Sequence, residues 1–554
     1  MYNTIKERLK HKKKEIEMES KKFNLCIIPT QFGKTFTAIK RMKYEIAQDE
    51  EMGRSIHVVF TMNTLLNNSQ FSERLNDIEE EYDINSICIF ASKYEGKYNF
   101  VKNLKELKGE CLDEYSCPRV LVMCSNGKRF EDGTEFIEVL NRNIGCITRV
   151  FIYYDELHKY INDDTRRQIE KIHDMDITHG IIALSATPDK IWKSNGFWSR
   201  LNLVYLNDFN DENYIGYRDM LFNCVDDIEY DDNTCKNQYP ELEKQDRKLM
   251  NFTDEILNRN ENILGVGTRT FIPGLQRVKS HNFIRKMIFT RNKECVVIML
   301  NGFEKTIKYN DENGRMMTIN LNGHDDEICN VIGGYIMEYK LEDRPIVMTG
   351  YICVSMGQTL SCESLGSFTS AIFGHLSLKN DEIYQLFGRI TGRMRNWKSY
   401  EKTKVYCYTD IMNRCSAMED CARNMARLAL DNDNEKRIVC RNDYIKPIQD
   451  KKVLKNMNVK VKMKKEVDIL DRLYMIFDTQ DHAIEWSRDT FKNGFKSRSI
   501  SKAPVALQMD GKNPTIEYVL KRWWGINKIN TKRMVPLDDG RWIVYWNKSL
   551  IEEK

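Results

Sequence analysis

Short apolar runs alternate with amphipathic stretches along most of the chain. The run "FNLCIIP" is followed by "KTFTAIKRMKYEIAQ", and "IHVVFTM" is followed by "LLNNSQFSERLNDIEEEY". The runs "SICIF", "RVLVMC", "RVFIYY" and "GIIALS" also lead into polar segments. Continuous apolar runs of this length are typical of strands buried on both faces. Their alternation with helical patterns predicts a parallel α/β sheet over residues 23–207.

A second α/β block is predicted over residues 263–430, with apolar runs such as "CVVIML" and "RPIVMTGYICVS". Within it, "KTIKYNDENGRMMTINL" predicts a β-hairpin, because Asn313 and Gly314 suit a tight turn. The acidic, polar segment 208–262 is predicted to be a connector that contains one short helix. The predicted fold class is therefore α/β, with two tandem parallel-sheet domains.

The ends of the chain differ from these blocks in composition. Residues 1–22 are predicted to form a helical extension, residues 431–465 a basic linker, and residues 466–554 a small accessory domain of mixed α/β character. A length of 554 residues agrees with two or three domains. No window of 18 consecutive apolar residues occurs, and the basic N-terminal stretch lacks the apolar core of a secretory signal. We therefore expect neither a membrane span nor a membrane partner.

The 16 cysteines favour reduced core residues over a metal site. None of them forms a C-x-x-C pair, and most lie singly in apolar surroundings such as "LCII" and "LVMCS". This usage predicts a reducing compartment, cytoplasmic or nuclear, and no zinc.

Charge and aromatic residues are concentrated toward the C-terminus. The net charge is +4, but residues 431–554 carry 26 Lys and Arg against 18 Asp and Glu. This surplus fits a polyanionic partner, although a solvated face is the commoner cause of a charge run. Five of the eight tryptophans lie in the same region, so Trp523 and Trp524 are candidates for stacking on bases. Alternatively, aromatic residues such as Trp542, Tyr545 and Trp546 fill a small core.

The stretch "IIPTQFGKTFTAIK" has the end of a phosphate-binding loop between a predicted strand and a predicted helix. Such a loop points backbone N–H groups at phosphates, extends a lysine to them and places a hydroxyl on Mg²⁺. The complete pattern requires glycine at position 28, where this chain has Ile28. The candidate nucleotide-binding residues are Thr30, Gln31, Phe32, Gly33, Lys34, Thr35 and Phe36.

The stretch "FIYYDELHKY" places Asp155 and Glu156 at the end of another apolar run. In parallel sheets, ligands bind outside the carboxyl ends of the strands. One carboxylate there can share Mg²⁺ with Thr35, and the second can orient or deprotonate a water. The alternative is an ordinary polar exit from a buried strand.

The stretches "PTQFGKT", "YYDELH", "LSATP" and "YQLFGRITGR" resemble, in order and approximate spacing, motifs I, II, III and VI of superfamily 2 helicases of the DExH type. The resemblance covers residues 23–412. It implies two RecA-like domains (a P-loop NTPase fold) with ATP and Mg²⁺ in the cleft between them. The overall look of the sequence also resembles the helicases of large DNA viruses.

The resemblance implies a role for each matched residue. Lys34 would hold phosphates, Thr35 and Asp155 would hold Mg²⁺, and Glu156 would be the general base. The coupling of nucleotide state to nucleic acid would fall to His158, Ser185 and Thr187. Further matched residues are Gly357 in motif V and three candidate nucleic-acid contacts in motifs Ia and Ib, namely Thr61, Asn63 and Ser125.

Motif VI supplies Gln385, Arg389 and Arg393 as further catalytic candidates. The helix predicted for "DEIYQLFGRITGRMR" would put both arginines on one face, because they are four residues apart. This chain departs from the usual pattern, in which the second arginine follows three residues after the first. Which arginine contacts the γ-phosphate therefore stays open, with Arg389 favoured. Gln31 is a second departure, since glycine is common at this position of motif I.

The leading hypothesis is an ATP-dependent helicase or translocase on nucleic acid. DNA is preferred over RNA because of the resemblance to viral helicases and because the Asn-, Ile-, Lys- and Tyr-rich composition suggests an AT-rich genome. A viral factory or a virion is a further candidate location, and a monomer is favoured. The alternatives are an RNA helicase, a translocase that remodels protein–DNA complexes without unwinding, and a nucleic-acid-binding scaffold with inactive ATPase motifs.

Overall fold

The computed structural model forms two compact units, Met1–Val459 and Lys460–Lys554. It describes residues 22–61, 71, 74–75, 87–92, 94, 98–110, 117–143, 147–193, 196–205, 211–322, 328–351, 360–430, 437–457, 472–490, 512–516, 518–519 and 533–547. The predicted extension 1–22 therefore lies outside the described residues except for Lys22.

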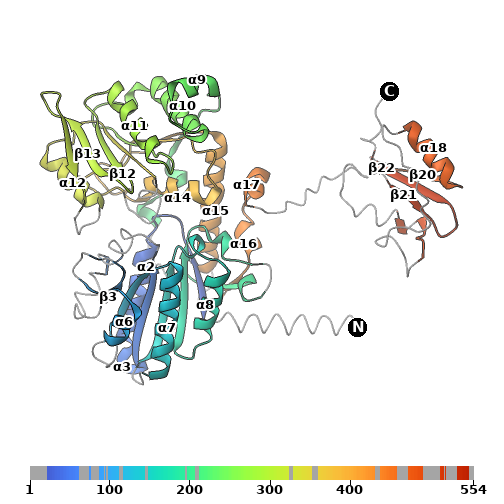
Figure 1. The fold of residues 1–554 in the computed structure, drawn as a ribbon, viewed down its shortest axis with the longest axis horizontal. Helices are drawn as coiled ribbons and strands as arrows, with labels where there is room; N and C mark the ends of the chain where they lie inside the picture. The colour runs from blue at the N-terminus through green and yellow to red at the C-terminus, as the bar shows by residue number, and fades with distance from the viewer. Residues whose placement is uncertain are drawn as a thin grey trace. The chain divides into compact units, whose positions relative to one another are not determined.

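The first unit contains two large sheets (Figure 1). The first has the order β19-β8-β1-β7-β6-β2-β5-β3-β4, and all its pairs are parallel except β19 with β8. Its strands are β1 (Phe23–Ile27), β2 (Arg54–Thr61), β3 (Ile87–Phe90), β4 (Asn99–Val101), β5 (Val120–Cys124), β6 (Ile147–Asp155), β7 (Thr178–Ser185), β8 (Leu201–Leu203) and β19 (Arg437–Val439). The helices of this part are α2 (Lys34–Ala47), α3 (Asp49–Met52), α6 (Leu104–Glu110), α7 (Gly127–Asn143) and α8 (Asp163–His173).

The second sheet has the order β10-β18-β16-β11-β15-β12-β13-β14 and is parallel apart from its last two strands. Its strands are β10 (Leu221–Cys224), β11 (Arg269–Phe271), β12 (Val296–Leu300), β13 (Lys305–Asn310), β14 (Met316–Asn320), β15 (Ile346–Gly350), β16 (Ser370–Phe373) and β18 (Lys404–Cys407). The helices are α9 (Asp232–Gln238), α10 (Lys244–Arg259), α11 (Val278–Arg291), α12 (Ile328–Glu338), α14 (Asn380–Phe387) and α15 (Thr409–Leu430).

The predicted α/β class with two tandem parallel sheets is confirmed. Central strands such as β5 and β12 are buried along their whole length, as continuous apolar runs require. The predicted hairpin is also confirmed: β13 and β14 pair antiparallel, and Gly314 adopts φ 74° in the turn between them.

Two segments expected to connect domains contribute strands to the sheets instead. Segment 208–262 supplies β10, which pairs with β18 at the edge of the second sheet, and α10, which is longer than the short helix expected. Residues 437–439, expected in a linker, form β19 at the edge of the first sheet. The chain therefore returns to the first sheet after completing the second.

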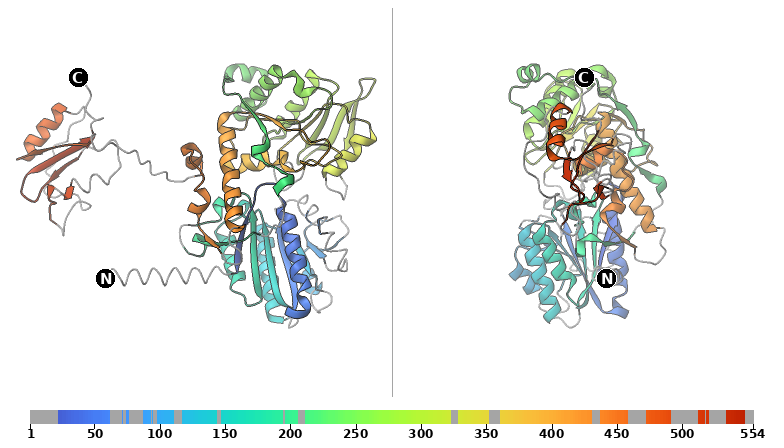
Figure 2. Two further views of the ribbon diagram at one scale, coloured as in Figure 1. Left: turned by 180° about the vertical axis from the view of Figure 1, so that it is seen from behind. Right: turned by 90° about the vertical axis from the view of Figure 1, so that its right-hand side faces the viewer.

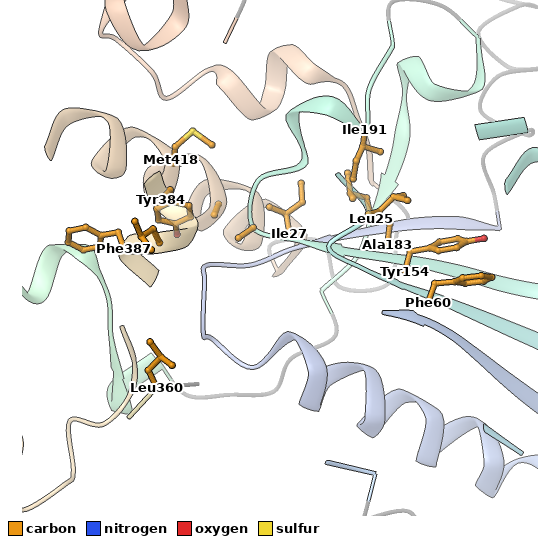
Figure 3. Packing of buried hydrophobic residues seen from close by; sticks show 14 of the residues in the cluster. Leu25, Ile27, Phe60, Tyr154, Ala183, Ile191, Leu360, Tyr384, Phe387 and Met418 are labelled. Carbon is orange, nitrogen blue, oxygen red and sulfur yellow. The ribbon is translucent and has the colours of Figure 1, made fainter. Parts of the chain in front are cut away.

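One continuous cluster of buried apolar side chains runs through both sheets. Figure 3 shows Leu25 and Ile27 of β1 in the same cluster as Tyr384 and Phe387 of α14 and Met418 of α15. Helix α15 contacts β1 as well as β10 and α14, and both views of Figure 2 show it beside the two sheets. The sheets are thus packed through a shared core.

The described part of the second unit contains a three-stranded antiparallel sheet and the helix α18. Its elements are β20 (Arg472–Phe477), β21 (Arg533–Pro536), β22 (Trp542–Asn547) and α18 (Gln480–Thr490). Tyr545 and Trp546 are buried on β22, and Trp546 lies 5.0 Å from the ring of Trp486. The core interpretation of these aromatic residues is therefore confirmed. Trp523 and Trp524 lie outside the described residues.

The described helices include none long and apolar enough to cross a membrane. The thirteen cysteines in the described part of the chain are free thiols. Most of them are more than nine-tenths buried. These thiols agree with the prediction of reduced core cysteines.

Gly388, which directly follows α14, packs against Thr30 in the loop between β1 and α2. A Cβ atom at Gly388 would lie 2.5 Å from Thr30 Oγ1 and 2.6 Å from Thr30 Cβ. We therefore expect Gly388→Ala to lower the melting temperature, because overpacking would reduce the free energy of unfolding by about 1–3 kcal/mol. Gly334 in α12 has no atom within 4 Å of the same position, so Gly334→Ala should instead stabilise by about 0.5–1 kcal/mol.

Thermal unfolding of both variants followed by circular dichroism checks this contrast. Equal melting temperatures for Gly388→Ala and the unmodified protein would refute the close packing of the two sheets at Thr30.

Candidate active site

The candidate phosphate loop connects the carboxyl end of β1 to the first turn of α2. Gln31 has φ 58° and Gly33 has φ 105°, so both residues adopt left-handed backbone conformations. Glycine enters this region without steric cost, whereas other residues pay about 1–2 kcal/mol. Gln31 thus takes the conformation that glycine would take, and the departure from the usual motif does not prevent a compact loop.

Lys34 and Thr35 begin α2 directly after this loop. The side chain of Thr37 donates a hydrogen bond to Gly33 O at 2.8 Å, which ties the helix start to the loop. Lys34 Nζ lies 3.0 Å from Glu156 Oε1, and the two side chains are only 10% and 6% exposed. Thr35 Oγ1 accepts a hydrogen bond of 3.3 Å from Arg74.

Glu156 follows the last residue of β6 and has an unusual backbone. Its φ of 50° is left-handed, and its N–H donates to Leu184 O at 2.9 Å. A non-glycine residue with positive φ is uncommon and often marks a functional position. In this conformation the Glu156 carboxylate contacts Lys34.

A buried hydrogen-bond network extends from Glu156 into the end of β7. His158 Nδ1 lies 3.3 Å from Glu156 Oε2 and 2.8 Å from Ser185 Oγ, and Nε2 lies 2.9 Å from Thr187 Oγ1. Thr187 N–H also donates to Ser185 Oγ at 3.0 Å. Burial, reinforced by the charge of Lys159, holds the pKa of His158 well below its ordinary value. The imidazole is therefore neutral, with one nitrogen donating and the other accepting.

The second sheet brings Gln385 and Arg389 to the same carboxylate. Gln385 Nε2 donates to Glu156 Oε2 at 3.5 Å, and both side chains are buried. Arg389 is 3% exposed; burial lowers its pKa to about 10, and the charge of Glu156 opposes that shift. The guanidinium therefore remains a buried cation that interacts electrostatically with Glu156.

The prediction that Arg389 and Arg393 share one helix face is wrong. Helix α14 ends at Phe387, Arg389 lies in a 3₁₀ turn (Gly388–Ile390), and Arg393 lies in the short strand β17 (Gly392–Arg393). Strand β17 pairs antiparallel with β9 (Tyr214–Ile215), and Arg393 is exposed. The 3₁₀ turn begins at Gly388, so α14 ends before it reaches either arginine, and their four-residue spacing does not place them on one helix face.

Other candidate residues are placed apart from this cluster. Phe36 is 45% exposed on α2, and Phe32 is buried against the ring of Tyr214 at 4.7 Å. Thr61 and Ser125 lie at the ends of β2 and β5, where Ser125 N–H donates to Thr61 O at 2.9 Å. Both of these side chains are more than nine-tenths buried. Asn63 and Gly357 lie outside the described residues.

Three residues near the site were missed by sequence reasoning. Tyr214 donates a hydrogen bond of 2.8 Å to Thr30 O, Arg74 donates to Thr35, and Gly388 packs on Thr30. Only Gly388 carried a signal, as the glycine directly before Arg389. Tyr214 and Arg74 lie in segments whose local sequence pattern does not predict a contact with the phosphate loop.

The donor set at the strand ends fits a nucleotide with Mg²⁺. Asp155 and Glu156 are adjacent carboxylates, with Lys34 bound to one of them. Desolvation and then the charge of Glu156 raise the pKa of Asp155 to about 7. A hydroxyl from Thr35 and an oxygen from Asp155 are the hard ligands that Mg²⁺ takes together with phosphates. In the described residues, no group of three or more His, Cys, Asp or Glu side chains could hold a metal ion by itself.

Comparison with known proteins assigns no family. No protein-family model and no curated protein matches the chain. Solved structures with a similar fold include the DUF1998 helicase MrfA bound to DNA and AMPPNP, with 14% identity, TM-score 0.39, and coverage of 76% of this chain and 50% of MrfA. Another is the DEAD-box helicase Mss116 bound to single-stranded RNA and UDP-BeF, with 12% identity, TM-score 0.40, and coverage of 78% and 75%. The chain thus spans about half the length of MrfA, and likeness of this degree assigns no activity.

The raised pKa of Asp155 predicts a specific dependence of stability on pH. The folded protein holds this proton up to about pH 7, whereas the ordinary pKa is 3.8. The stability that this group contributes is therefore present at low pH and is lost as pH rises through about 7. We expect Asp155→Asn to raise the melting temperature when it is measured above pH 7, with little or no gain near pH 4, because the substitution removes the cost of ionising a buried carboxyl group.

Melting temperatures measured between pH 4 and pH 8 test this expectation, with exposed Asp343 replaced by Asn as the control. A gain that is the same at every pH, or that also occurs in the control, would contradict it.

Proposed function

We propose that the chain is an ATP-dependent helicase or translocase whose hydrolysis is stimulated by nucleic acid. One observation carries this proposal: Glu156 contacts both Lys34, at the end of the phosphate loop, and Gln385 of α14, which belongs to the second α/β block. Because Glu156 contacts residues of both α/β blocks, its ability to act as general base would depend on the relative position of the two blocks. ATP would bind at residues 30–36, facing Arg389.

In this mechanism Lys34 moves from Glu156 to the phosphates of the nucleotide. Glu156 then has a free oxygen that can accept the proton of the attacking water. Gln385 orients the carboxylate or the water, and Arg389 approaches the charge that develops on the phosphoryl group. Mg²⁺, held by Thr35 and Asp155, would neutralise phosphate charge.

Coupling to nucleic acid is proposed through His158. Because its two nitrogens contact Ser185 and Thr187, a shift of Glu156 is passed to the end of β7. The candidate nucleic-acid contacts are Asn63 in the first unit and Trp523 and Trp524 in the second, because the side chains of Thr61 and Ser125 are buried. DNA is the favoured partner, in a reducing cytoplasmic, nuclear or viral setting.

Nucleic-acid-stimulated ATP hydrolysis tests the proposal directly. ATPase rates are measured with single-stranded DNA, duplex DNA and RNA, and we expect the largest stimulation with DNA. Glu156→Gln should lower kcat by about 10²- to 10⁴-fold and leave ATP binding intact, because it removes proton acceptance. Glu131→Gln, on the exposed face of α7, is the matched control.

Each alternative has its own outcome in this experiment. Stimulation by RNA alone would overturn the preference for DNA. Strand displacement is then measured on tailed duplexes, and ATPase activity without displacement would favour a remodelling translocase. An inactive protein, unchanged by Glu156→Gln, would be a binding scaffold.

The two arginines of motif VI should differ strongly. Arg389 is buried and interacts electrostatically with Glu156, whereas Arg393 is exposed on β17. We expect Arg389→Ala to lower kcat by about 10³-fold, as loss of a transition-state arginine does, and Arg393→Ala by less than about ten-fold. Steady-state ATPase kinetics of both variants provide the measurement. A larger loss from Arg393→Ala would assign the role to that residue.

A further inference from the structure

Tyr214 contacts the two residues of the candidate phosphate loop, Thr30 and Phe32, that flank Gln31. Its hydroxyl donates a hydrogen bond of 2.8 Å to Thr30 O, and its ring packs edge-on against Phe32 at 4.7 Å. Gln31, between these two contacts, has the left-handed φ of 58°. Tyr214 itself is 2% exposed, so neither contact is shared with solvent.

Two hydroxyl groups lie within hydrogen-bond distance of Thr30 O, and the Tyr214 hydroxyl is the nearer at 2.8 Å. Thr391 Oγ1 lies 3.4 Å from the same carbonyl oxygen but 2.8 Å from Gly388 O. A hydroxyl has one proton, so Thr391 donates to the nearer Gly388 O. Removing the Tyr214 hydroxyl would therefore leave a buried carbonyl oxygen without a good donor.

The backbone of Tyr214 is attached to the segment that carries Arg389. Strand β9 pairs with β17 through Ile215 with Gly392 and Tyr214 with Arg393. Strand β17 begins two residues after the Arg389 turn ends at Ile390. One residue thus holds the phosphate loop by its side chain and the Arg389 segment by its main chain.

Helix α15 also contacts the Tyr214 ring, through Arg423. The Arg423 guanidinium lies 5.4 Å from the ring centroid, and Glu419 accepts a hydrogen bond of 2.8 Å from Arg423. Glu419 also accepts from Tyr217 N–H at 2.9 Å. The ring is therefore held between the loop and a helix that contacts both sheets.

We infer that Tyr214 is a positioning residue that keeps the phosphate loop in register with Arg389. This inference rests on the proposed ATPase function, since it assigns that site a link between the nucleotide pocket of one sheet and the arginine of the other. Tyr214 touches no reacting atom and acts through Thr30 and β17.

Tyr214→Phe tests the link, because it removes the hydroxyl and keeps the ring. Loss of one neutral hydrogen bond changes an equilibrium about two- to ten-fold, so we expect kcat to fall by that factor. The KM for ATP should change less, since Arg389 acts on the transition state and not on bound ATP. Tyr217→Phe is the matched control, because its hydroxyl donates to Met412 O at 2.7 Å and not to the loop.

A double-mutant cycle separates positioning from general stability. In an Arg389→Ala background, Tyr214→Phe should cause little further loss of kcat, because the positioned group is absent. Losses that multiply independently, or an equal fall of kcat in Tyr217→Phe, would overturn the inference.

Hydrogen exchange supplies a readout that does not depend on ATPase activity. Backbone amides of residues 28–35 should exchange about two- to ten-fold faster in Tyr214→Phe than in the unmodified protein or in Tyr217→Phe. Unchanged exchange in Tyr214→Phe would refute the inference, even if the protein proved not to hydrolyse ATP. Absence of ATPase together with faster exchange would refute the proposed function alone.

Discussion

The carboxylate of Glu156 is held by groups from two sheets, and the arrangement of the candidate site depends on it. Lys34 binds one oxygen, while His158 and Gln385 approach the other. In a buried setting such charge-assisted contacts are stronger than in water, and an unmatched carboxylate would be costly. The left-handed backbone at Glu156 is the local cost of this placement, and the packing of β6 against β7 supports it.

The same constraint explains why the second sheet packs so closely at the phosphate loop. Gln385 reaches Glu156 from α14, and the end of this helix packs against Thr30. The approach is so close that a Cβ atom at Gly388 would clash with the Thr30 side chain. Thr30, Tyr214 and the Arg389 turn then form one contact region. This region joins residues more than 350 positions apart in the chain, since Thr391 Oγ1 lies 3.4 Å from Thr30 O. Close packing of this kind transmits small shifts because it cannot be compressed.

The neutral imidazole of His158 gives the site a second direction of communication. A charged histidine at this position would compete with Lys34 for Glu156, whereas the neutral ring links hydroxyl groups at the end of β7. In the proposed mechanism, Glu156 would exchange its contact with Lys34 for one with a water, and His158 would respond to that exchange. This division of roles follows from burial, which disfavours the charged imidazole.

The sequence by itself determined the two parallel sheets, the hairpin at Asn313 and Gly314, and the clustering of Lys34, Glu156 and His158 at strand ends. These features rest on local patterns: apolar runs specify buried strands, and the carboxyl ends of parallel strands meet at one edge. The tertiary structure alone decided the end of α14 before Arg393, the joining of β10 and β19 to the sheets, and the position of Tyr214 under the phosphate loop. Strands of two to four residues and contacts across nearly 200 positions have no local signature, because their free energy comes from the packing of distant segments.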